Sequence, residues 1–286
     1  MIWSIVSKAE MEGFGTSPVF RFYREALGKN NIKLAVVEEN DKLDFVGEGD
    51  IVLLRSANPY LVRTIKEKGV RTTAEYMCSY EMVANKSLLS TLLANNGIAV
   101  PRQYSINEVE EGKTYFVKPK LGSDSMGISL QSICRTIDEV KRRVAYIKEE
   151  LGDKAVIEDF VEGVDCTVAC WKKDGVINTC AIEVECEETS SIQTRDCKVG
   201  FKEYCSALHD EAIDAIAKNV FELLGIKHHA RIDFRRGNDG KYYLIDVNLL
   251  AGLGPIDHFA KCLLLSRNMS YTDAMWAIVN TATTLK

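Results

Sequence analysis

The stretch Arg231–Asn248, RIDFRRGNDGKYYLIDVN, carries acidic side chains in two strand-like runs. The dipeptide Asp239-Gly240 is typical of a two-residue type I′ turn in a β-hairpin. That turn would pair Asn238 with Lys241 and would place Asp233 directly opposite Asp246. Because like charges that face each other destabilise a sheet by up to about 1 kcal/mol, we expect positive charge beside the two carboxylates.

Two arrangements would supply that charge. Side-chain alternation along a strand puts Arg231 and Arg235 on the same face as Asp233, where both arginines could neutralise the aspartates in a surface ladder. Alternatively, Asp233, Asp246 and the Asn248 amide oxygen could hold a divalent cation, because Mg²⁺ prefers hard oxygen ligands. Asn248 favours the metal, since its amide adds a ligand without adding charge. The same alternation also predicts that Tyr242 and Leu244 share the face of Asp246.

A second stretch could bind an anion. In YFVKPKLGSDSMGISL, a Gly- and Ser-rich turn follows Lys118, and the backbone N–H groups and hydroxyls of such a turn can donate to phosphate oxygens. The Walker pattern G-x-x-x-x-G-K-[ST] is absent, which disfavours a P-loop; an ordinary hairpin turn is the alternative. Lys86, on a preceding predicted helix, could complete a nucleotide clamp. Glu158 and Asp165, at two strand ends, could bracket a purine and its ribose or could simply be solvated.

The rest of the chain predicts the elements that hold these residues. Residues 1–75 alternate short apolar runs with amphipathic ones, which is typical of βαβ order and of a small parallel sheet. Thr136 opens the capping box TIDE and predicts a helix start. Residues 187–207 are polar and aperiodic, so we expect a long loop of the kind that often acts as a lid. The other expected elements are helices at 80–96, 136–150 and 213–224, strands at 115–119, 127–131, 155–160, 165–171 and 176–185, and one or two helices after the hairpin.

Composition limits the function classes. The chain has 286 residues, 46% of them hydrophobic, and a formal net charge of -5 with both signs interspersed, so we expect neither nucleic-acid nor membrane binding. There is no signal-peptide pattern and no apolar run of membrane-spanning length, so we expect a cytoplasmic protein. The nine cysteines contain no CxxC pair and are expected to be reduced thiols.

Taken in order, these segments resemble the ATP-grasp superfamily, most closely its D-alanine:D-alanine ligase-like branch. The matching segments are VKPKLGSDSMGIS, VIEDFVEGVDCTV, ARIDF and YYLIDVN, and the resemblance runs from about Lys86 to Asp257. It implies an α/β (α+β) ATP-grasp fold with three units. These are an N-terminal parallel α/β pre-ATP domain at 1–78, a small central lid domain with its leading helix at 79–160, and a C-terminal antiparallel-sheet catalytic domain at 161–286.

The resemblance also implies roles for individual residues. Lys86 and Lys118 are similar to phosphate-binding lysines, and Arg231 to the arginine that steadies the oxyanion and the transferred phosphate. Catalysis is accordingly expected from Arg231 and Lys118, and metal binding from Asp233, Asp246 and Asn248. The expected ATP-binding residues are Lys86, Lys118, the phosphate-covering loop with Ser123, Ser125, Met126 and Gly127, the adenine acceptor Glu158, Phe160 and Val161 under the ring, the ribose acceptor Asp165, and Arg195, with Lys198 or Lys202 as alternatives to Arg195.

Departures from the family pattern concern the substrates. Asp246 stands where glutamate is usual and is one methylene shorter, which leaves one or two bound ions open. Asp257 replaces a serine that touches a substrate carboxylate in the D-alanine ligases, and an acid there could accept an amine instead. Arg55, Gly252 and His258 are further candidate substrate contacts.

The implied activity is that of an ADP-forming, ATP-dependent carboxylate-amine ligase. A small carboxylic acid, an amino acid or a peptide, would become an acylphosphate and then be joined to an amine. The cofactors would be ATP and Mg²⁺, with Mn²⁺ as an alternative, and a homodimer is left open. Two other hypotheses are an ATP-grasp enzyme with another acceptor, such as a carboxylase or thiol ligase, and a nucleotide-binding protein without turnover.

Overall fold

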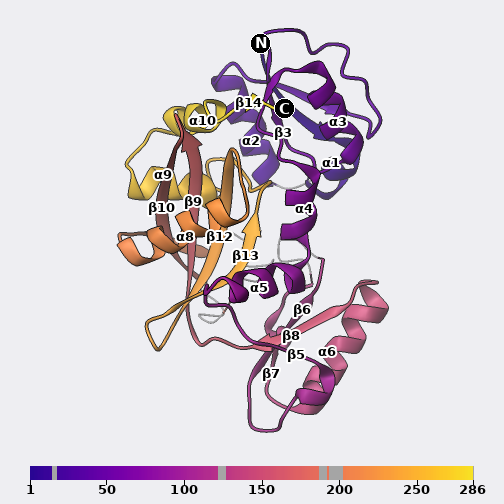
Figure 1. Cartoon of the computed structure of the whole chain (residues 1–286), viewed down its shortest axis with the longest axis vertical. Helices are drawn as coiled ribbons and strands as arrows, with labels where there is room; N and C mark the ends of the chain where they lie inside the picture. Colours follow the sequence, from indigo (N-terminus) through magenta and orange to yellow (C-terminus); the bar gives the residue numbers. More distant parts are fainter. Residues whose placement is uncertain (15–17, 122–126, 187–191, 193–201, 286) are drawn as a thin grey trace.

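The computed structural model of the chain describes residues 1–14, 18–121, 127–186, 192 and 202–285. Within these residues the strands form three separate sheets. Figure 1 shows the N-terminal sheet at one end of the molecule, a large sheet beside it and a small sheet at the other end, with helix α5 between the large and small sheets. No helix in the described part of the chain is long and apolar enough to cross a membrane.

The N-terminal sheet confirms the predicted parallel βαβ order. Its strand order is β14-β4-β3-β1-β2, and the neighbouring pairs among β1 to β4 are all parallel. The last strand, β14, comes from the far end of the chain and pairs antiparallel with β4. The elements are β1 (Ile2–Ser7), α1 (Lys8–Phe14), α2 (Pro18–Lys29), β2 (Lys33–Val37), β3 (Ile51–Leu54), α3 (Pro59–Lys68), β4 (Arg71–Thr72) and β14 (Thr283–Thr284).

Two helices replace the single helix expected at 80–96. Helix α4 (Met77–Ala84) ends at Asn85, and α5 (Lys86–Asn95) begins directly after it. Asn85 has φ −90° and ψ 90°, and its side chain accepts a hydrogen bond from the Leu88 N–H. Asparagine therefore ends one helix and caps the next, which places Lys86 at the first position of α5.

The small sheet has the order β5-β8-β6-β7 and packs against helix α6, whose predicted start at the Thr136 capping box is confirmed. The strand expected at 127–131 is wrong. Gly127 takes a left-handed φ of 70°, and a 3₁₀ turn follows. The elements are β5 (Gln103–Tyr104), the 3₁₀ turn η1 (Ile106–Glu108), β6 (Tyr115–Pro119), η2 (Leu130–Ser132), β7 (Ile133–Cys134), α6 (Ile137–Glu150) and β8 (Ala155–Asp159).

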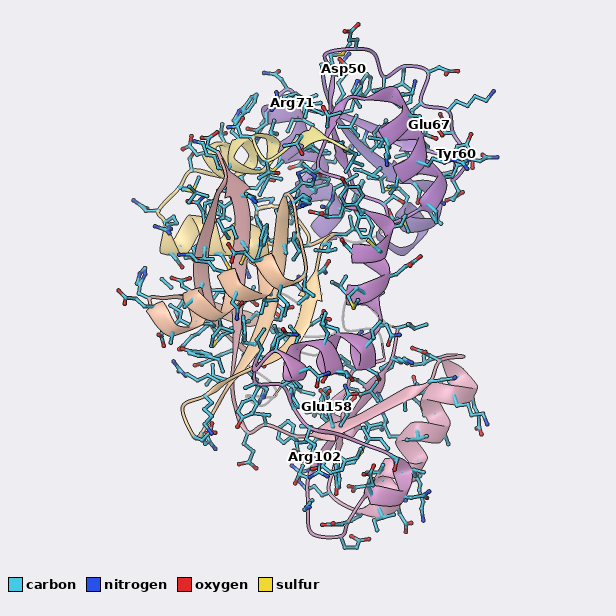
Figure 2. All side chains as sticks on the ribbon, viewed as in Figure 1. Asp50, Tyr60, Glu67, Arg71, Arg102 and Glu158 are labelled. Carbon is cyan, nitrogen blue, oxygen red and sulfur yellow. The ribbon has the colours of Figure 1, made fainter. Side chains whose placement is uncertain are left out.

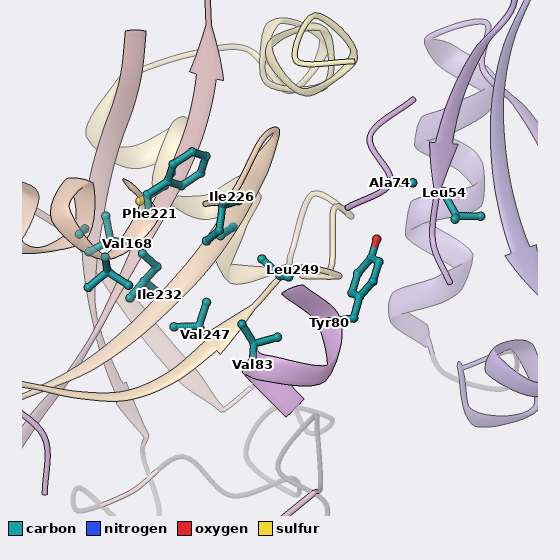
Figure 3. Close-up of a cluster of buried hydrophobic side chains, with 14 of the residues drawn as sticks. Leu54, Ala74, Tyr80, Val83, Val168, Phe221, Ile226, Ile232, Val247 and Leu249 are labelled. Atoms are coloured by element: carbon teal, nitrogen blue, oxygen red, sulfur yellow. The ribbon is translucent and has the colours of Figure 1, made fainter. Parts of the chain in front are cut away.

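The large sheet is antiparallel, has the order β11-β10-β9-β12-β13 and is covered on both faces. Val168 and Cys170 of β9 pack in the cluster that contains α8, whereas Ala169 and Trp171 pack in the cluster that contains α9. Figure 3 shows part of the first cluster. The elements are β9 (Gly163–Lys173), β10 (Val176–Cys186), β11 (Glu203–Leu208), α8 (Glu211–Leu223), β12 (His229–Gly237), β13 (Tyr242–Asn248), α9 (His258–Ser266) and α10 (Tyr271–Val279).

Two sequence expectations fail at the edge of this sheet. Residues 203–207 belong to strand β11 and not to a loop; residues 187–191 and 193–201 lie outside the described part. Seven described cysteines are free thiols, but Cys186 is disulfide-bonded, so the expectation of reduced thiols throughout is wrong there.

A buried carboxylate joins the N-terminal sheet to the large sheet. Glu75 follows β4, is 1% exposed, and accepts hydrogen bonds from the backbone N–H groups of Lys227 and His228 just before β12. Burial raises the pKa of Glu75 from 4.5 to about 7, although both N–H groups oppose the shift. The junction therefore carries a group that titrates near neutral pH.

We expect Glu75→Gln to remove a pH-dependent loss of stability. Because the folded-state pKa is raised, the carboxyl contributes its full stability below about pH 4.5 and loses it as the pH rises through about 7. Relative to wild type, the variant should gain about 2 to 3 kcal/mol in unfolding free energy between pH 5 and pH 8. Urea titrations at both pH values measure this, with the exposed Glu81→Gln as control; parallel pH profiles for wild type and Glu75→Gln would contradict it.

Candidate active site

The hairpin β12–β13 places Asp233 opposite Asp246 and Arg231 opposite Asn248, as predicted. The turn that produces this register differs from the predicted one. The Gly237 N–H donates to the Lys241 carbonyl at 2.9 Å and the Gly240 N–H donates to the Gly237 carbonyl at 2.9 Å, so Asn238 does not pair with Lys241. Residues 238–240 form a three-residue loop, in which Gly240 has the left-handed φ of 78° that such loops require.

A β-bulge compensates for the longer turn. The register shifts between Asp233 and Phe234, which leaves Ile245 as an extra residue in β13. Leu244 is 3% exposed in the core beneath α8, and strict alternation from it would turn Asp246 toward that core. The bulge reverses the alternation and puts Asp246 beside Asp233. The prediction that Tyr242 and Leu244 share the face of Asp246 is therefore wrong.

Arg231 holds one of the two aspartates. Its Nε lies 3.0 Å from both carboxylate oxygens of Asp233 and its Nη2 lies 2.8 Å from Oδ2, while the Thr167 hydroxyl donates to Oδ1 at 2.9 Å. The other arginine of the predicted surface ladder, Arg235, pairs with Asp165 instead, at 2.6 Å. The ladder is thus only half formed, and Asp246 has no ion pair with any residue that the structure describes.

Asp246 shows the cost of placing two carboxylates together. Burial raises the pKa of Asp246, Lys86 opposes that shift, and the charge of Asp233 adds to it. Asn248 lies beside them, and its Oδ1 accepts a hydrogen bond from the Leu250 N–H at 2.9 Å. A divalent cation fits this donor set, because it would offset the repulsion and meet only oxygen ligands.

The donor set also limits which metal ion these residues could hold. The described residues contain no group of three or more His, Cys, Asp or Glu side chains that could hold a metal ion. Two carboxylates and one amide, each binding through one oxygen, leave half of an octahedral shell to other ligands. Such a site is typical of Mg²⁺, which is usually bound by one or two carboxylates together with water and substrate phosphates.

Two lysines approach the aspartates from the opposite side. Lys118 of β6 lies 2.6 Å from Glu158 Oε1 of β8, both side chains being about 5% exposed, and its Nζ donates to the Ile245 carbonyl at the bulge at 3.4 Å. Burial raises the pKa of Glu158, and Lys118 opposes the shift. Figure 2 shows Glu158 on the small sheet, below α5. Lys86, at the start of α5, has its pKa lowered by burial, and Asp246 opposes that change.

The residues assigned to the nucleoside lie where the small sheet joins the large one. Phe160 and Val161 connect β8 to β9, and Asp165 lies near the start of β9. The Phe160 ring stacks on Phe116 of β6 with centroids 6.4 Å apart. The structure therefore brings Glu158, this connection and both lysines beside the hairpin β12–β13.

The candidate substrate residues surround the segment that follows Asn248. Arg55, at the end of β3, donates through Nη2 to the carbonyls of Leu250 and Ala251 at 2.8 and 2.5 Å. Asp257 accepts from the Gly254 N–H at 2.7 Å, and it packs so closely on Gly252 that a Cβ there would lie 2.4 Å from its Cγ. Arg55, Gly252 and Asp257 are thus brought together.

His258 directly follows Asp257 and pairs with β11, and the expected loop residues are only partly described. The His258 Nε2 lies 2.7 Å from Glu203 Oε2 of β11, and both side chains are buried. The surroundings of Gly127 leave no room for a side chain, because a Cβ there would lie 2.5 Å from Leu151 Cδ1. Lys202 directly precedes β11. The remaining expected loop residues, Ser123, Ser125, Met126, Arg195 and Lys198, lie outside the described part of the chain.

Sequence reasoning missed three contributors to this site. Thr167 reaches Asp233 because β9 pairs with β12, a pairing between segments far apart in the chain. Glu203 pairs with His258 across a similar distance in sequence. The Ile245 carbonyl contacts Lys118 only because the strand bulges. No local pattern in the sequence indicates any of these contacts.

Comparison with solved structures identifies the architecture. A D-alanine--D-alanine ligase from Bacillus anthracis, solved in complex with ATP, superposes with a TM-score of 0.71 over 98% of this chain and 96% of its own at 19% identity. The VanG D-Ala:D-Ser ligase from Enterococcus faecalis gives 0.74 over 98% of both chains at 13% identity. The chain therefore has the ATP-grasp fold that the sequence predicted.

Comparison of the sequence assigns the chain to a narrower family than the fold alone does. The family model described as D-ala D-ala ligase C-terminus matches residues 91–280, well over half of the chain. The chain belongs to this family. A D-alanine--D-alanine ligase from Aquifex aeolicus is 29% identical over 143 residues, which cover 48% of this chain and 46% of that protein. The matched region thus spans about half the length of that curated relative.

We expect Lys118→Met to destabilise the fold through Glu158. Removing the lysine leaves a buried carboxylate without its ion-pair partner, which costs about 3 kcal/mol of unfolding free energy near pH 8. The raised pKa of Glu158 would rise further, so the variant should regain stability as the pH falls and the carboxyl protonates.

Urea unfolding measures both effects. The double variant Lys118→Met/Glu158→Gln should recover most of the lost stability, and Lys154→Met, at an exposed lysine just before β8, should change little. Equal losses in the single and double variants would show that the lysine does not compensate Glu158.

Proposed function

We propose that the chain is an ADP-forming ATP-dependent ligase that joins a small carboxylic acid to an amine through an acylphosphate. The observation that carries this proposal is the contact between Lys118 and the bulge of β13. It brings Lys118 of the small sheet next to the paired aspartates of the large sheet, where Lys86 of α5 also lies close to Asp246. A polyphosphate placed between them would meet positive charge from one side and metal-binding oxygens from the other.

The nucleotide would lie between the two sheets. Lys118 and Lys86 would bind its phosphates, with Gly127 and the loop residues Ser123, Ser125, Met126 and Arg195 covering them. Glu158 would accept from the adenine amino group above Phe160 and Val161, and Asp165 would accept from the ribose. The burial of Lys118 and Glu158 supports these roles, since a desolvated lysine interacts more strongly with phosphate than an exposed one.

Asp233, Asp246 and Asn248 would hold Mg²⁺, or Mn²⁺, against the nucleotide. When bound, the metal would neutralise charge on the phosphates and orient the transferred group. Arg231 fixes the Asp233 carboxylate through its Nε and Nη2, so it would hold that ligand in place while facing the same anionic region. Mg²⁺ binding would need an ionised Asp246, which Lys86 favours.

The proposed reaction needs no protein nucleophile. A substrate carboxylate oxygen attacks the γ-phosphorus, the bond to the β-phosphate oxygen breaks, and ADP leaves. The amine then attacks the acyl carbon, inorganic phosphate leaves, and the amine releases a proton. Arg231 and Lys118 would stabilise the negative charge that spreads over the transferring oxygens, because positioning and electrostatics dominate phosphoryl transfer.

The family relatives support amino acids as substrates. The curated relative and the B. anthracis structure carry the name D-alanine--D-alanine ligase, and VanG is named a D-Ala:D-Ser ligase. In this chain, Arg55, Gly252 and Asp257 would line the substrate side, with His258 next to them. Asp257 argues against a second substrate with a free carboxylate, because two carboxylates would repel each other there.

Release of ADP tests the proposed reaction. A coupled assay over amino acids, dipeptides and amines should give ADP only when both an acid and an amine are present with Mg²⁺. Turnover with bicarbonate or a thiol in place of the amine would point to another acceptor. Nucleotide binding without ADP release for any combination of acid and amine would indicate a nucleotide-binding protein without turnover.

We expect Asp233→Asn and Asp246→Asn each to lower Mg²⁺-dependent ATP turnover at least 100-fold while the protein stays folded. Each change removes a charged metal ligand and relieves the repulsion between the carboxylates, so Asp246→Asn should not lower the unfolding free energy, whereas Asp233→Asn also loses the ion pair with Arg231 and should lower it. Steady-state ADP release and circular dichroism together check this. Normal turnover in either variant would rule out the metal assignment.

We also expect Asp257→Ser to change the acceptor preference. The serine removes a negative charge beside Gly252, so KM should fall about tenfold for amine substrates with a free carboxylate and rise for amines without one. The KM for ATP serves as internal control and should stay constant. An unchanged ratio of the two acceptor KM values would show that Asp257 does not face the acceptor.

A further inference from the structure

Arg235 grips the segment that connects the small sheet to the large one. Its Nε donates to the Val161 carbonyl at 2.5 Å, its Nη2 to the Gly163 carbonyl at 2.9 Å and its Nη1 to Asp165 Oδ1 at 2.6 Å. Its guanidinium also lies 5.4 Å from the centroid of the Phe160 ring. One side chain thus contacts four of the six residues 160–165, which include the connection and the start of β9.

The ladder between β9 and β12 explains why this grip is possible. Arg235 is the direct cross-strand partner of Asp165, so their side chains leave the sheet on the same face. The backbones also approach closely, since a Cβ on Gly163 would lie 1.9 Å from the Arg236 carbonyl oxygen. The connection is therefore fixed to β12 through backbone contact and through the guanidinium.

The contacts of Arg235 have two different consequences. The two carbonyl contacts fix the path of residues 161–163, whereas the ion pair fixes the orientation of the Asp165 carboxylate. A planar guanidinium suits both tasks because its donors point in fixed directions. Both groups of the pair are about 90% buried or more, so the ion pair is largely shielded from water and constrains the direction in which the Asp165 carboxylate points.

We propose that Arg235 is a positioning residue for the nucleoside: it holds the Asp165 carboxylate in the orientation that receives the ribose hydroxyls. The inference rests on the nucleotide site of the proposed function. Arg235 itself contacts Asp165 through Oδ1, and ribose would be recognised by the carboxylate that Arg235 orients. The consequence is a ligand preference for a ribose with a 2′-hydroxyl over a 2′-deoxyribose.

Calorimetric titration with ADP and with 2′-deoxy-ADP, both with Mg²⁺, tests this role in the full chain. The wild type should bind ADP about tenfold or more tightly than 2′-deoxy-ADP. Arg235→Met should weaken ADP binding about tenfold and reduce the ratio between the two nucleotides to about one. If Arg235 acted only in folding, the variant would instead bind both nucleotides more weakly by the same factor.

Arg236→Met is the matched control. Arg236 is the next residue, faces the other side of β12 and pairs with Glu183 at 2.6 Å on a partly exposed surface. This variant loses one arginine from the same strand, yet it should keep the wild-type ratio of the two dissociation constants.

Asp165→Asn provides a second measure that does not depend on the folding of the Arg235 variant. It should also abolish discrimination between the nucleotides, and the double variant Arg235→Met/Asp165→Asn should bind ADP no worse than Arg235→Met alone. Three results would each overturn the proposal. They are an unchanged ratio of the two dissociation constants in Arg235→Met, an equal loss of affinity for both nucleotides, and additive losses of ADP affinity in the double variant.

The outcome separates this inference from the proposed reaction. A wild type that binds ADP but forms no amide contradicts the ligase alone, and the two titrations then still decide the role of Arg235. A wild type that binds neither nucleotide with Mg²⁺ overturns both.

Discussion

The β-bulge at Ile245 is the constraint on which the site depends. A regular strand with Leu244 in the core would send Asp246 into the same core, where an ionised carboxylate is costly. The extra residue lets β13 bury Leu244 and still present Asp246 beside Asp233. It also frees the Ile245 carbonyl to meet Lys118. One irregularity thus sets both the acidic pair and its contact with the other sheet.

The electrostatics of the site follow from this arrangement. Acidic groups stand on the large sheet, and lysines reach them from the small sheet and from α5. Burial works against the charge of Asp246, Glu158 and Lys86, and in each case a neighbour of opposite charge resists it. The buried charges on the two sheets therefore stabilise one another, and such an arrangement suits a ligand that carries several charges of its own.

Features that depend on neighbouring residues could be predicted from the sequence, whereas pairing between distant segments could not. The Thr136 capping box and the parallel order of the first strands follow from neighbouring residues, and both are confirmed. The face-to-face aspartates were predicted for an incomplete reason. The assumed turn was one residue too short and the bulge was missed, and the two errors cancel at Asp233.

Other errors have the same physical origin. The break at Asn85 depends on one side chain that caps a new helix within an otherwise helical pattern. Strand β11 is held by pairing with β10, which its own polar sequence does not indicate. The partners of Asp165, Asp233 and His258 come from strands whose order in the sheet is set by tertiary packing. The types of the site residues could be predicted, but their partners could not.

Strand β14 gives the chain an unusual order of assembly. It closes the edge of the N-terminal sheet at β4, although about two hundred residues separate the two strands. During synthesis β4 therefore emerges with an unpaired edge, and about two hundred further residues must follow before β14 can pair with it. Such distant pairing slows folding and leaves a strand edge open to wrong partners in the interval. Completion of the first sheet thus depends on a segment that is synthesised long after its other strands.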